Sequence, residues 1–463
     1  MVNQSSDTAA RAFVVEGGTP LTGDITVNRA KNSALYLILA AVLTAEPVVL
    51  RHVPKLRDVL VLLEILEHVG VTVRWQGHDL HLHAHHLERT DAPYAMVSRM
   101  RASFVALGAL LGRSGEARIS MPGGCAFGPR PVDRHIKAFR QLGAQVQEEG
   151  GDFAVWLERP LAGTVTFDAP TVGGTQNVLL ASALGSDTVI IENAALEPEI
   201  TDLANMLNGM GAQVRGAGSS HIEVIGVAKL TGIDYQPIPD RIEAGTLMLA
   251  AAATRGHIVL HHVVPEHLQA VTSILQACGV VVRDASRPEW SVAQARDTAT
   301  NHVATNHTAT NELVTSLEVD ARATLTPAHV RAEVYPGIPT DVQAPFGAFL
   351  ATVPGASTVI DDVYPDRFTH VAELQCMGAN ATLNEAVLEL HGGSLRGKTV
   401  HAADIRAGGA LIIAALAAEG TSYVTGVEYI ERGYEALDSR LQRLGARITL
   451  HESVDAVVMP SAV

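Results

Sequence analysis

The chain has few cysteines, few aromatic residues and no long hydrophobic segment. Only three of its 463 residues are cysteine, and none of them forms a Cys-x-x-Cys pair. This excludes a disulfide framework and a zinc site of that kind, and it predicts a reducing compartment. The longest apolar run, Ser33 to Leu50, is interrupted by Thr44, Glu46 and Pro47 and is too short to span a bilayer.

Positive charge is also scarce. The chain has 34 Lys and Arg residues against 49 Asp and Glu residues, which gives a formal net charge of -15 at pH 7. This balance argues against a general nucleic-acid binder, although a local basic pocket for a small anion is compatible with it. Residues 1–11 are polar and lack the apolar core of a signal peptide. We therefore expect a cytoplasmic protein that does not insert into a membrane.

A repeat runs through the whole chain. Segments of the Leu-Gly-Ala type recur around six glycines, and four of the five intervals between them are nearly equal; the glycines are Gly70, Gly143, Gly211, Gly279, Gly378 and Gly445. Glycine commonly follows the last turn of a helix, where it adopts a positive φ. We therefore predict that each of these glycines ends a helix in one of six similar units.

Each unit contains a first helix, a short β-branched strand, a second helix and a further strand. The first helices are rich in alanine and are expected at Ser33–Thr44, Ala102–Leu111, Thr175–Leu184, Ala244–Ala253, Gln343–Val353 and Ala407–Ala418. They are apolar on nearly all sides, which indicates that they are buried. The sequence thus predicts an α/β protein with two pseudo-symmetric domains of three units each.

The interval between Gly279 and Gly378 is longer than the others because it contains a polar, low-complexity segment at about residues 284–314. Its five-residue repeats, which begin with Ala-Thr-Asn, are typical of a loop on the surface or of a disordered loop. A solvated loop is favoured over a metal site for the histidines of this segment, and the spacing from His262 to Glu266 does not match an inverted zincin motif. We therefore predict no metal site.

The stretch from Met121 to Asp133 has the composition of a loop that presents a thiol. Cys125 lies there among glycines and prolines, and Arg130 would favour its thiolate form. The alternative is an ordinary connecting turn. The other two cysteines, Cys278 and Cys376, lie in apolar segments and are expected to be buried.

Charged residues occur at matching points of the repeat, where the first helices begin. They are Lys31, Arg101, Arg241, Asp341 and Arg406, with Arg432 in a later loop. A cation at a helix N-terminus opposes the helix dipole, and an anionic ligand would explain its presence. A shared anion pocket and a set of surface charges are the two interpretations. Asp341 fits either a general base near Cys125 or a helix N-cap.

Several ordered motifs resemble one protein family. They include Ala30-Lys31-Asn32-Ser33, Met100-Arg101-Ala102-Ser103, Pro122-Gly123-Gly124-Cys125, Arg130-Pro131-Val132-Asp133, Pro339-Thr340-Asp341 and Arg432-Gly433-Tyr434-Glu435. From about Phe13 to His451, apart from the low-complexity segment, the chain resembles the enolpyruvyl transferases, in particular the branch that acts on UDP-N-acetylglucosamine.

The resemblance implies two inside-out α/β domains, each made of three βαβαββ-type units around buried helices. One domain would comprise residues 31–238 and carry the Cys125 loop. The other would comprise residues 1–30 and 239–463 and carry the insert at 284–314. The two domains would close on the substrates.

The resemblance also implies a reaction. Enolpyruvyl would pass from phosphoenolpyruvate to the 3-hydroxyl of UDP-N-acetylglucosamine with release of phosphate, the first committed step of peptidoglycan synthesis and the step that fosfomycin inhibits. No metal or organic cofactor would be needed. The expected partners are these two small molecules, without nucleic acid or membrane, and the expected assembly is a monomer or a weak homo-oligomer.

Residue roles follow from the same resemblance. Cys125, Asp341, Lys31 and Arg432 would be catalytic: Cys125 would protonate or covalently hold phosphoenolpyruvate, and Asp341 would accept the hydroxyl proton. The phosphate and carboxylate would be bound by Lys31, Arg101, Arg130, Arg406 and Arg432. Arg130, Pro131, Val132 and Asp133 would line the uridine site, and Thr171, Val172 and Gly173 would meet the diphosphate. Asn32, Thr340 and Asp341 would hold the sugar, with Arg367 nearby.

Other functions stay open at this point. The sister transferase that acts on shikimate 3-phosphate shares the architecture and phosphoenolpyruvate, but the Cys125 loop and Arg130-Pro131-Val132-Asp133 resemble the branch that acts on UDP-N-acetylglucosamine. A silent paralogue that only binds a nucleotide sugar would be expected to have lost Cys125, Lys31 or Asp341, and this chain has all three. A transferase specialised for another nucleotide sugar is a further alternative.

Overall fold

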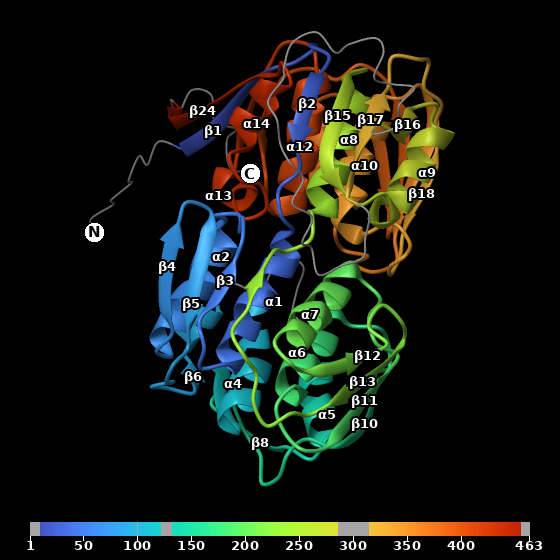
Figure 1. The fold of residues 1–463 in the computed structure, drawn as a ribbon. Helices are drawn as coiled ribbons and strands as arrows, with labels where there is room; N and C mark the ends of the chain where they lie inside the picture. The colour runs from blue at the N-terminus through green and yellow to red at the C-terminus, as the bar shows by residue number, and fades with distance from the viewer. Residues whose placement is uncertain (1–9, 100, 122–131, 286–313, 455–463) are drawn as a thin grey trace, which may run out of the picture. The chain divides into compact units, whose positions relative to one another are not determined.

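The computed structural model describes residues 10–99, 101–121, 132–285 and 314–454. These residues form six four-stranded sheets and their helices, divided between two compact units (Figure 1). The first unit comprises the described residues from Asn28 to Asp240. The second comprises those before Asn28 and after Asp240. In the described part of the chain, every helix is too short or too polar to cross a bilayer.

One repeat of the first unit illustrates all six. Its elements are β10 (Gly163–Thr166), α6 (Val172–Ser182), β11 (Thr188–Glu192), α7 (Pro198–Gly209), β12 (Gln213–Arg215) and β13 (His221–Ile225). The strand order is β10-β11-β13-β12, with β10 parallel to β11 and β13 antiparallel to both of its neighbours. Since the other five sheets have the same pairing pattern, the expected βαβαββ repeat is confirmed.

The other two repeats of the first unit follow this scheme. The second contains β6 (Asp91–Ala92), α3 (Tyr94–Val97), the 3-10 helix η2 (Arg101–Val105), α4 (Ala106–Ser114), β7 (Glu116–Ser120), α5 (Asp133–Gln141), β8 (Gln145–Glu149) and β9 (Asp152–Trp156). The third contains α1 (Lys31–Ala40), the 3-10 helix η1 (Ala41–Leu43), β3 (Val48–Leu50), α2 (Arg57–His68), β4 (Thr72–Gln76) and β5 (Asp79–His83). Its first strand is β14 (Asp234–Tyr235), which pairs in parallel with β3 although it comes last in the unit.

The second unit also has three repeats. The first contains β2 (Thr22–Thr26), α8 (Arg241–Ala253), β15 (His257–Val263), the 3-10 helix η3 (Pro265–Leu268), α9 (Gln269–Ala277), β16 (Val281–Asp284) and β17 (Thr315–Asp320). The second contains β18 (His329–Ala332), the 3-10 helix η5 (Thr340–Val342), α10 (Gln343–Leu350), β19 (Gly355–Asp361), α11 (His370–Cys376), β20 (Asn380–Asn384) and β21 (Val387–Gly392). The third contains β22 (Thr399–His401), α12 (Ile405–Ala417), β23 (Thr421–Thr425), α13 (Val427–Ile430), α14 (Leu437–Arg443) and β24 (Arg447–Val454). The N-terminal strand β1 (Ala10–Glu16) completes the last sheet between β23 and β24.

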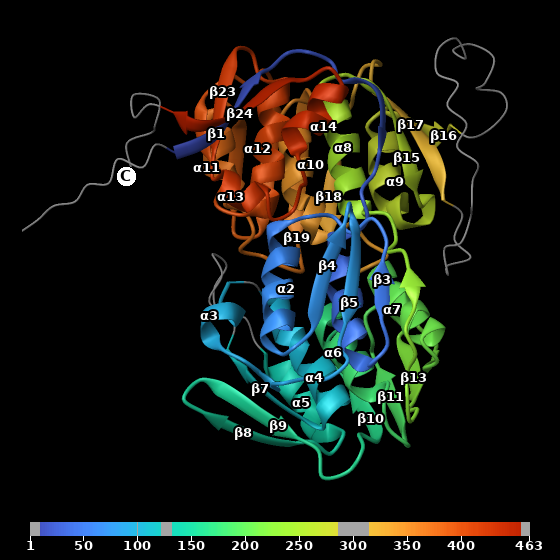
Figure 2. The same ribbon diagram turned by 60° about the vertical axis from the view of Figure 1, so that its left-hand side comes forward.

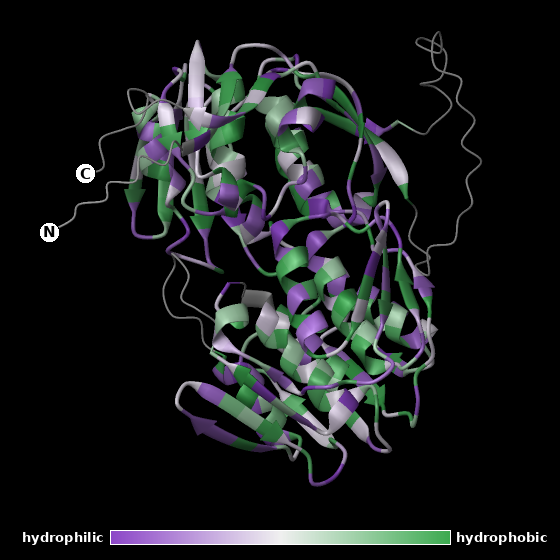
Figure 3. Ribbon diagram, turned by 90° about the vertical axis from the view of Figure 1, so that its left-hand side faces the viewer, coloured by the Kyte–Doolittle hydropathy of each residue, from purple (hydrophilic) through white to green (hydrophobic). Residues whose placement is uncertain are grey.

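The first helices of the repeats form the centre of each unit. In the first unit α1, α4 and α6 contact one another, and in the second unit α8, α10 and α12 do the same (Figure 2). Every residue of α8 is buried, which confirms the prediction drawn from the apolar helix pattern. Figure 3 shows hydrophobic residues running through these helices and the strands around them. Because the sheets surround the helices, each unit is inside-out in the sense that was expected.

The repeated glycines end the second helices, as predicted. All six have positive φ, between 85° for Gly445 and 104° for Gly211. An L-residue with a side chain would be strained there, which explains why glycine recurs at this point of the repeat. The low-complexity segment lies outside the described residues except at its ends, where β16 ends at Asp284 and the antiparallel β17 begins at Thr315.

The two described cysteines differ from each other. Cys278 is fully buried, and burial raises the pKa of its thiol to about 11. Cys376 is exposed, so the expectation that it is buried was wrong. Cys376 is the last residue of α11, whose buried side is formed by His370, Val371 and Leu374. Its apolar neighbours in the sequence did not indicate which side of this short helix it occupies.

Candidate active site

The N-terminus of α12 places Arg406. Asp404 is the N-cap residue, and its Oδ1 accepts hydrogen bonds from the backbone N of Arg406 at 2.8 Å and of Ala407 at 3.1 Å. Its Oδ2 accepts a hydrogen bond from Thr369 Oγ1 at 2.7 Å. Arg406 is therefore fixed in the first turn of a buried helix, where its positive charge opposes the helix dipole and needs a negative partner.

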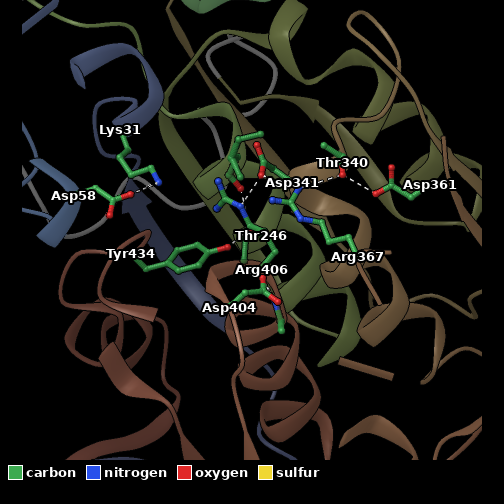
Figure 4. Close-up of polar contacts among 12 residues, drawn as sticks. Lys31, Asp58, Thr246, Thr340, Asp341, Asp361, Arg367, Asp404, Arg406 and Tyr434 are labelled. Atoms are coloured by element: carbon green, nitrogen blue, oxygen red, sulfur yellow. Dashed lines mark hydrogen bonds and ion pairs between the residues drawn. The ribbon is translucent and has the colours of Figure 1, made fainter. Parts of the chain in front are cut away.

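That partner is Asp341 of η5 (Figure 4). Arg406 Nε donates to Asp341 Oδ1 at 2.9 Å, and Arg367 Nη1 donates to the same oxygen at 3.2 Å. Two guanidinium groups thus converge on one carboxylate. Asp341 is not the N-cap of α10, since Val342 holds that position. The geometry therefore favours a charged site over the capping role that the sequence left open.

Arg367 is held by two further contacts. Its Nη1 also donates to Thr340 Oγ1 at 3.1 Å, and its guanidinium carbon lies 5.2 Å from the centre of the Tyr364 ring. Thr340 Oγ1 donates in turn to Asp361 Oδ2 at 2.6 Å. Thr340, Asp341, Arg367 and Arg406, which we call the Asp341 cluster, are four predicted site residues that the structure brings together.

Arg432 lies in the loop after α13. Two residues later, the buried Tyr434 places its hydroxyl 3.0 Å from Thr246 Oγ1 of α8. A Cβ at Gly409 of α12 would come within 2.6 Å of the same hydroxyl oxygen, so only glycine allows the ring this close. Through Tyr434, the Arg432 loop therefore contacts both of the central helices α8 and α12.

In the first unit, Lys31 is the first residue of α1 and is buried. Its Nζ donates to Asp58 Oδ2 at 3.1 Å, and its backbone N donates to Asp240 Oδ2 at 3.1 Å. The side chains of Lys31 and Asp58 are only 8% and 7% exposed. Asn32 follows in the same turn. Sequence reasoning missed Asp58, because an acidic residue in the first turn of an amphipathic helix usually serves the helix dipole at the surface.

The remaining predicted residues occupy loops and helix starts of the first unit. Thr171 caps α6, its Oγ1 accepting from the backbone N of Gly174 at 3.3 Å, and Val172 and Gly173 form the first turn. Val132 is buried before α5, which begins with Asp133, and Arg101 begins η2. Within the first unit, no described hydrogen bond joins Thr171, Val132 or Asp133 to Lys31. Cys125, Arg130 and Pro131 lie outside the described residues.

Two acidic residues near the start of α8 bind groups of other elements. Asp240 accepts the hydrogen bond from Lys31 N, and Glu243 of α8 forms an ion pair with Arg440 of α14 at 3.0 Å. Asp202 of α7 was not singled out from the sequence. It is fully buried and accepts hydrogen bonds from Tyr235 Oη at 2.6 Å and from Ile238 N at 3.2 Å.

Comparison with known proteins agrees with this architecture. The family model of EPSP synthase (3-phosphoshikimate 1-carboxyvinyltransferase) matches residues 15–441. The chain is 50% identical over 446 residues to the UDP-N-acetylglucosamine 1-carboxyvinyltransferase of Thermus thermophilus, which covers 96% of this chain and 98% of the relative. It is 47% identical over 435 residues to the enzyme of the same name from Deinococcus radiodurans, covering 94% of this chain and 96% of the relative.

Solved structures agree in fold. The enolpyruvyl transferase NikO from Streptomyces tendae has a TM-score of 0.80 at 22% identity, covering 96% of this chain and 99% of that chain. The EPSP synthase of Acinetobacter baumannii has a TM-score of 0.70 at 20% identity, covering 95% of this chain and 100% of that chain. At these identities the likeness concerns the fold alone. By the family match and the full-length relatives, the chain belongs to the enolpyruvyl transferase family, together with the UDP-N-acetylglucosamine 1-carboxyvinyltransferases.

Proposed function

We propose that the chain transfers the enolpyruvyl group of phosphoenolpyruvate to the 3-hydroxyl of UDP-N-acetylglucosamine and releases phosphate, the first committed step of peptidoglycan synthesis. The observation that carries this proposal is the identity of 46–50% with enzymes of that name over nearly their whole length. The Asp341 cluster supports it, because a carboxylate held between two cations beside a hydroxyl-bearing threonine suits an anionic sugar substrate.

The reaction needs a base for the sugar hydroxyl, and Asp341 fills this role. As the hydroxyl oxygen forms a bond to C2 of phosphoenolpyruvate, Asp341 takes its proton while C3 gains a proton from an acid. Cys125 is the proposed acid, on the resemblance of its loop. The C2–O bond to phosphate then breaks and C3 loses a proton, which restores the enol ether on the sugar and leaves inorganic phosphate.

The cations of the Asp341 cluster serve the anionic parts of the substrates. Arg406 and Arg367 both donate to Asp341 Oδ1 in the structure. A phosphate or carboxylate that binds one of these guanidinium groups competes with Asp341 for it. Binding of the anion therefore weakens one of the contacts that stabilise the carboxylate and leaves it better able to accept a proton. Arg432 is proposed to add positive charge from its loop.

In the first unit Lys31 is the proposed partner of phosphoenolpyruvate. An ammonium group has three donors, and the contact with Asp58 at 3.1 Å uses one of them. Arg101 and Arg130 are proposed to bind the same anion, and Asn32 is proposed to hold the sugar. Thr171, Val172 and Gly173 at the start of α6 are proposed to meet the diphosphate, since a helix N-terminus presents unpaired N–H groups. Arg130 through Asp133 complete the uridine site in this proposal.

The names of the relatives favour this acceptor over shikimate 3-phosphate. The presence of Lys31, Cys125 and Asp341 favours an active enzyme over a silent paralogue. We further propose that the enzyme works in the cytoplasm, as a monomer or a weak homo-oligomer, without a metal or organic cofactor.

The test is phosphate release from phosphoenolpyruvate, measured with and without UDP-N-acetylglucosamine in the wild type and in Cys125→Ala. Release that depends on the nucleotide sugar and is lost in the variant supports the reaction, the acceptor and the role of the thiol. Release that survives the substitution keeps the transferase and removes Cys125 from its role. Absence of release with intact nucleotide-sugar binding contradicts the proposed activity, and absence of binding contradicts the acceptor.

A further inference from the structure

Asp361, the last residue of β19, is a fully buried carboxylate that is not among the predicted site residues. It lies beside Thr340 at the edge of the Asp341 cluster in the second unit (Figure 4). A buried carboxylate is costly unless hydrogen bonds satisfy it, so its contacts indicate what it holds in place. Those contacts go to two different segments.

The first contact is with the loop that carries Asp341. Thr340 Oγ1 donates to Asp361 Oδ2 at 2.6 Å. Because the hydroxyl hydrogen is directed at Asp361, the oxygen presents its lone pairs elsewhere, and it accepts from Arg367 Nη1 at 3.1 Å. Asp361 therefore sets the direction of the Thr340 hydroxyl.

The second contact is with the turn that leads to Arg367. Asp361 Oδ1 accepts from the backbone N of Val363 at 2.9 Å and of Tyr364 at 2.8 Å. Fixing this backbone fixes the Tyr364 ring, over which the Arg367 guanidinium lies at 5.2 Å. Both oxygens of Asp361 thus act on Arg367, one through Thr340 and one through Tyr364.

We propose that Asp361 is a positioning residue of the acceptor site, which aligns Thr340 and Arg367 so that Arg367 holds Asp341 in the orientation needed for proton transfer. This inference rests on the proposed function. Arg406 does not depend on Asp361 in the same way, because Asp404 and the start of α12 hold it. Loss of Asp361 should therefore disturb the sugar side of the site more than the phosphoenolpyruvate side.

The partners of Asp361 offset part of the cost of burying its carboxyl group. Burial raises the pKa of this group above its usual value, and the hydrogen bonds from Thr340, Tyr364 and Val363 and the charge of Arg367 act in the opposite direction. In Asp361→Asn an NH₂ group replaces one oxygen. The NH₂ group then faces either the Thr340 hydroxyl hydrogen or the two backbone N–H groups. One of the two contacts made by Asp361 is therefore lost with almost no change in side-chain volume.

The experiment measures steady-state kinetics of the full chain with both substrates varied, in the wild type, Asp361→Asn and Asp362→Asn. We expect Asp361→Asn to lower kcat/KM for UDP-N-acetylglucosamine about tenfold to a hundredfold, as displacement of reacting groups by a fraction of an ångström to an ångström does. The KM for phosphoenolpyruvate should stay within about twofold. Asp362 is exposed and pairs with Arg331 at 2.7 Å away from the cluster, so Asp362→Asn should match the wild type.

The pH profile separates positioning from direct catalysis. If Asp361 only positions other groups, Asp361→Asn retains the acidic limb of kcat/KM for UDP-N-acetylglucosamine at a lower plateau. If the acidic limb disappears, Asp361 itself is the titrating base and the inference is overturned. Equal losses for both substrates, or kinetics equal to the wild type per folded molecule, also overturn it. An inactive wild type contradicts the proposed function instead.

A second pair of variants covers the case in which Asp361→Asn does not fold. Thr340→Ser keeps the hydroxyl that links Asp361 to Arg367, whereas Thr340→Val removes it at similar volume. We expect kcat/KM for the nucleotide sugar to be about tenfold lower in Thr340→Val than in Thr340→Ser. Equal kinetics of the two variants would show that the Thr340 hydroxyl does not position Arg367, and would contradict the proposal.

Discussion

The two charged clusters of this protein, one in each unit, differ in charge balance and in access to solvent. In the first unit, Lys31 pairs with Asp58, and both side chains are more than nine-tenths buried. In the second unit, two arginines meet the single carboxylate of Asp341, which is 24% exposed. Both clusters nevertheless include a cation in the first turn of a central helix, α1 or α12.

This difference indicates how each cluster can be used. A buried pair in low dielectric depends on both partners, since either one left alone keeps its desolvation cost. The Asp341 cluster has an excess of one positive charge and is partly open, so an anion can join it without an opening of the core. We therefore infer that Lys31 combines a structural and a catalytic role, whereas the residues of the Asp341 cluster serve mainly to bind the ligand and to carry out the reaction.

Removing the carboxylate of the open cluster should have the largest effect. We expect Asp341→Asn to lower kcat about 10²–10⁴-fold, the range for loss of a general base, with a smaller change in the stability of the protein. Steady-state kinetics and urea denaturation of the same preparation measure both quantities. Asp366→Asn, at an exposed position next to Arg367 in the sequence, is the control. A kcat within tenfold of the wild type would place the base elsewhere.

Removing the cation of the buried pair should instead be costly to the fold. Lys31→Met removes the cation that donates to the buried Asp58, and we expect a loss of about 3–5 kcal/mol in the free energy of unfolding. The double variant Lys31→Met with Asp58→Leu should regain much of this stability and stay inactive. Recovery of activity together with stability would show that Lys31 has no chemical role, and an unchanged stability of Lys31→Met would contradict its structural role.

The stability of the second unit should depend on pH through His370, the first residue of α11. Burial lowers the pKa of His370 to about 4, although the charge of Asp404 acts in the opposite direction. Its unfolded pKa is near 6.5, so the unfolded state binds more protons between these values. Stability from this group is present above pH 6.5 and falls as the pH falls towards 4, by about 3 kcal/mol in all.

The measurement for His370 is the free energy of unfolding against pH in the wild type and in His370→Leu. The difference between the two curves separates the contribution of His370 from that of the acidic residues, which titrate in a similar pH range. We expect the variant to lose the part of the slope that lies between about pH 6.5 and pH 4. Parallel curves through this window would mean that His370 is not buried in its neutral form.

The smallest effect is expected for the hydroxyl that fastens the Arg432 loop. Tyr434→Phe removes the hydrogen bond to Thr246, whose hydroxyl still donates to Ile242 O at 2.8 Å. Because Thr246 keeps a partner, the cost should be about 1 kcal/mol in stability. Thermal denaturation measures this, with Tyr423→Phe as a matched variant on β23. A loss in kcat well beyond the stability change would assign the hydroxyl a part in placing Arg432.

Local patterns in the sequence predicted much of the fold. Helix-ending glycines such as Gly211 depend on backbone sterics that any unit imposes, and buried helices such as α8 show no polar side. The exposed Cys376 was predicted wrongly, because a seven-residue helix gives too little periodicity to fix its orientation. The topology by which β14 and β1 complete distant sheets left no local signal, since strand pairing depends on contacts far apart in the chain.

The candidate site shows the same division. By itself the sequence determined which charged groups stand at the helix starts, among them Lys31, Asp341 and Arg406, because a helix N-terminus is a local feature. Only the tertiary structure decided their partners. It joined Lys31 to Asp58, and it enclosed Asp361 behind Thr340 and Arg367. Such pairings depend on burial and on distances of a few ångströms between separate elements, and a linear sequence contains neither.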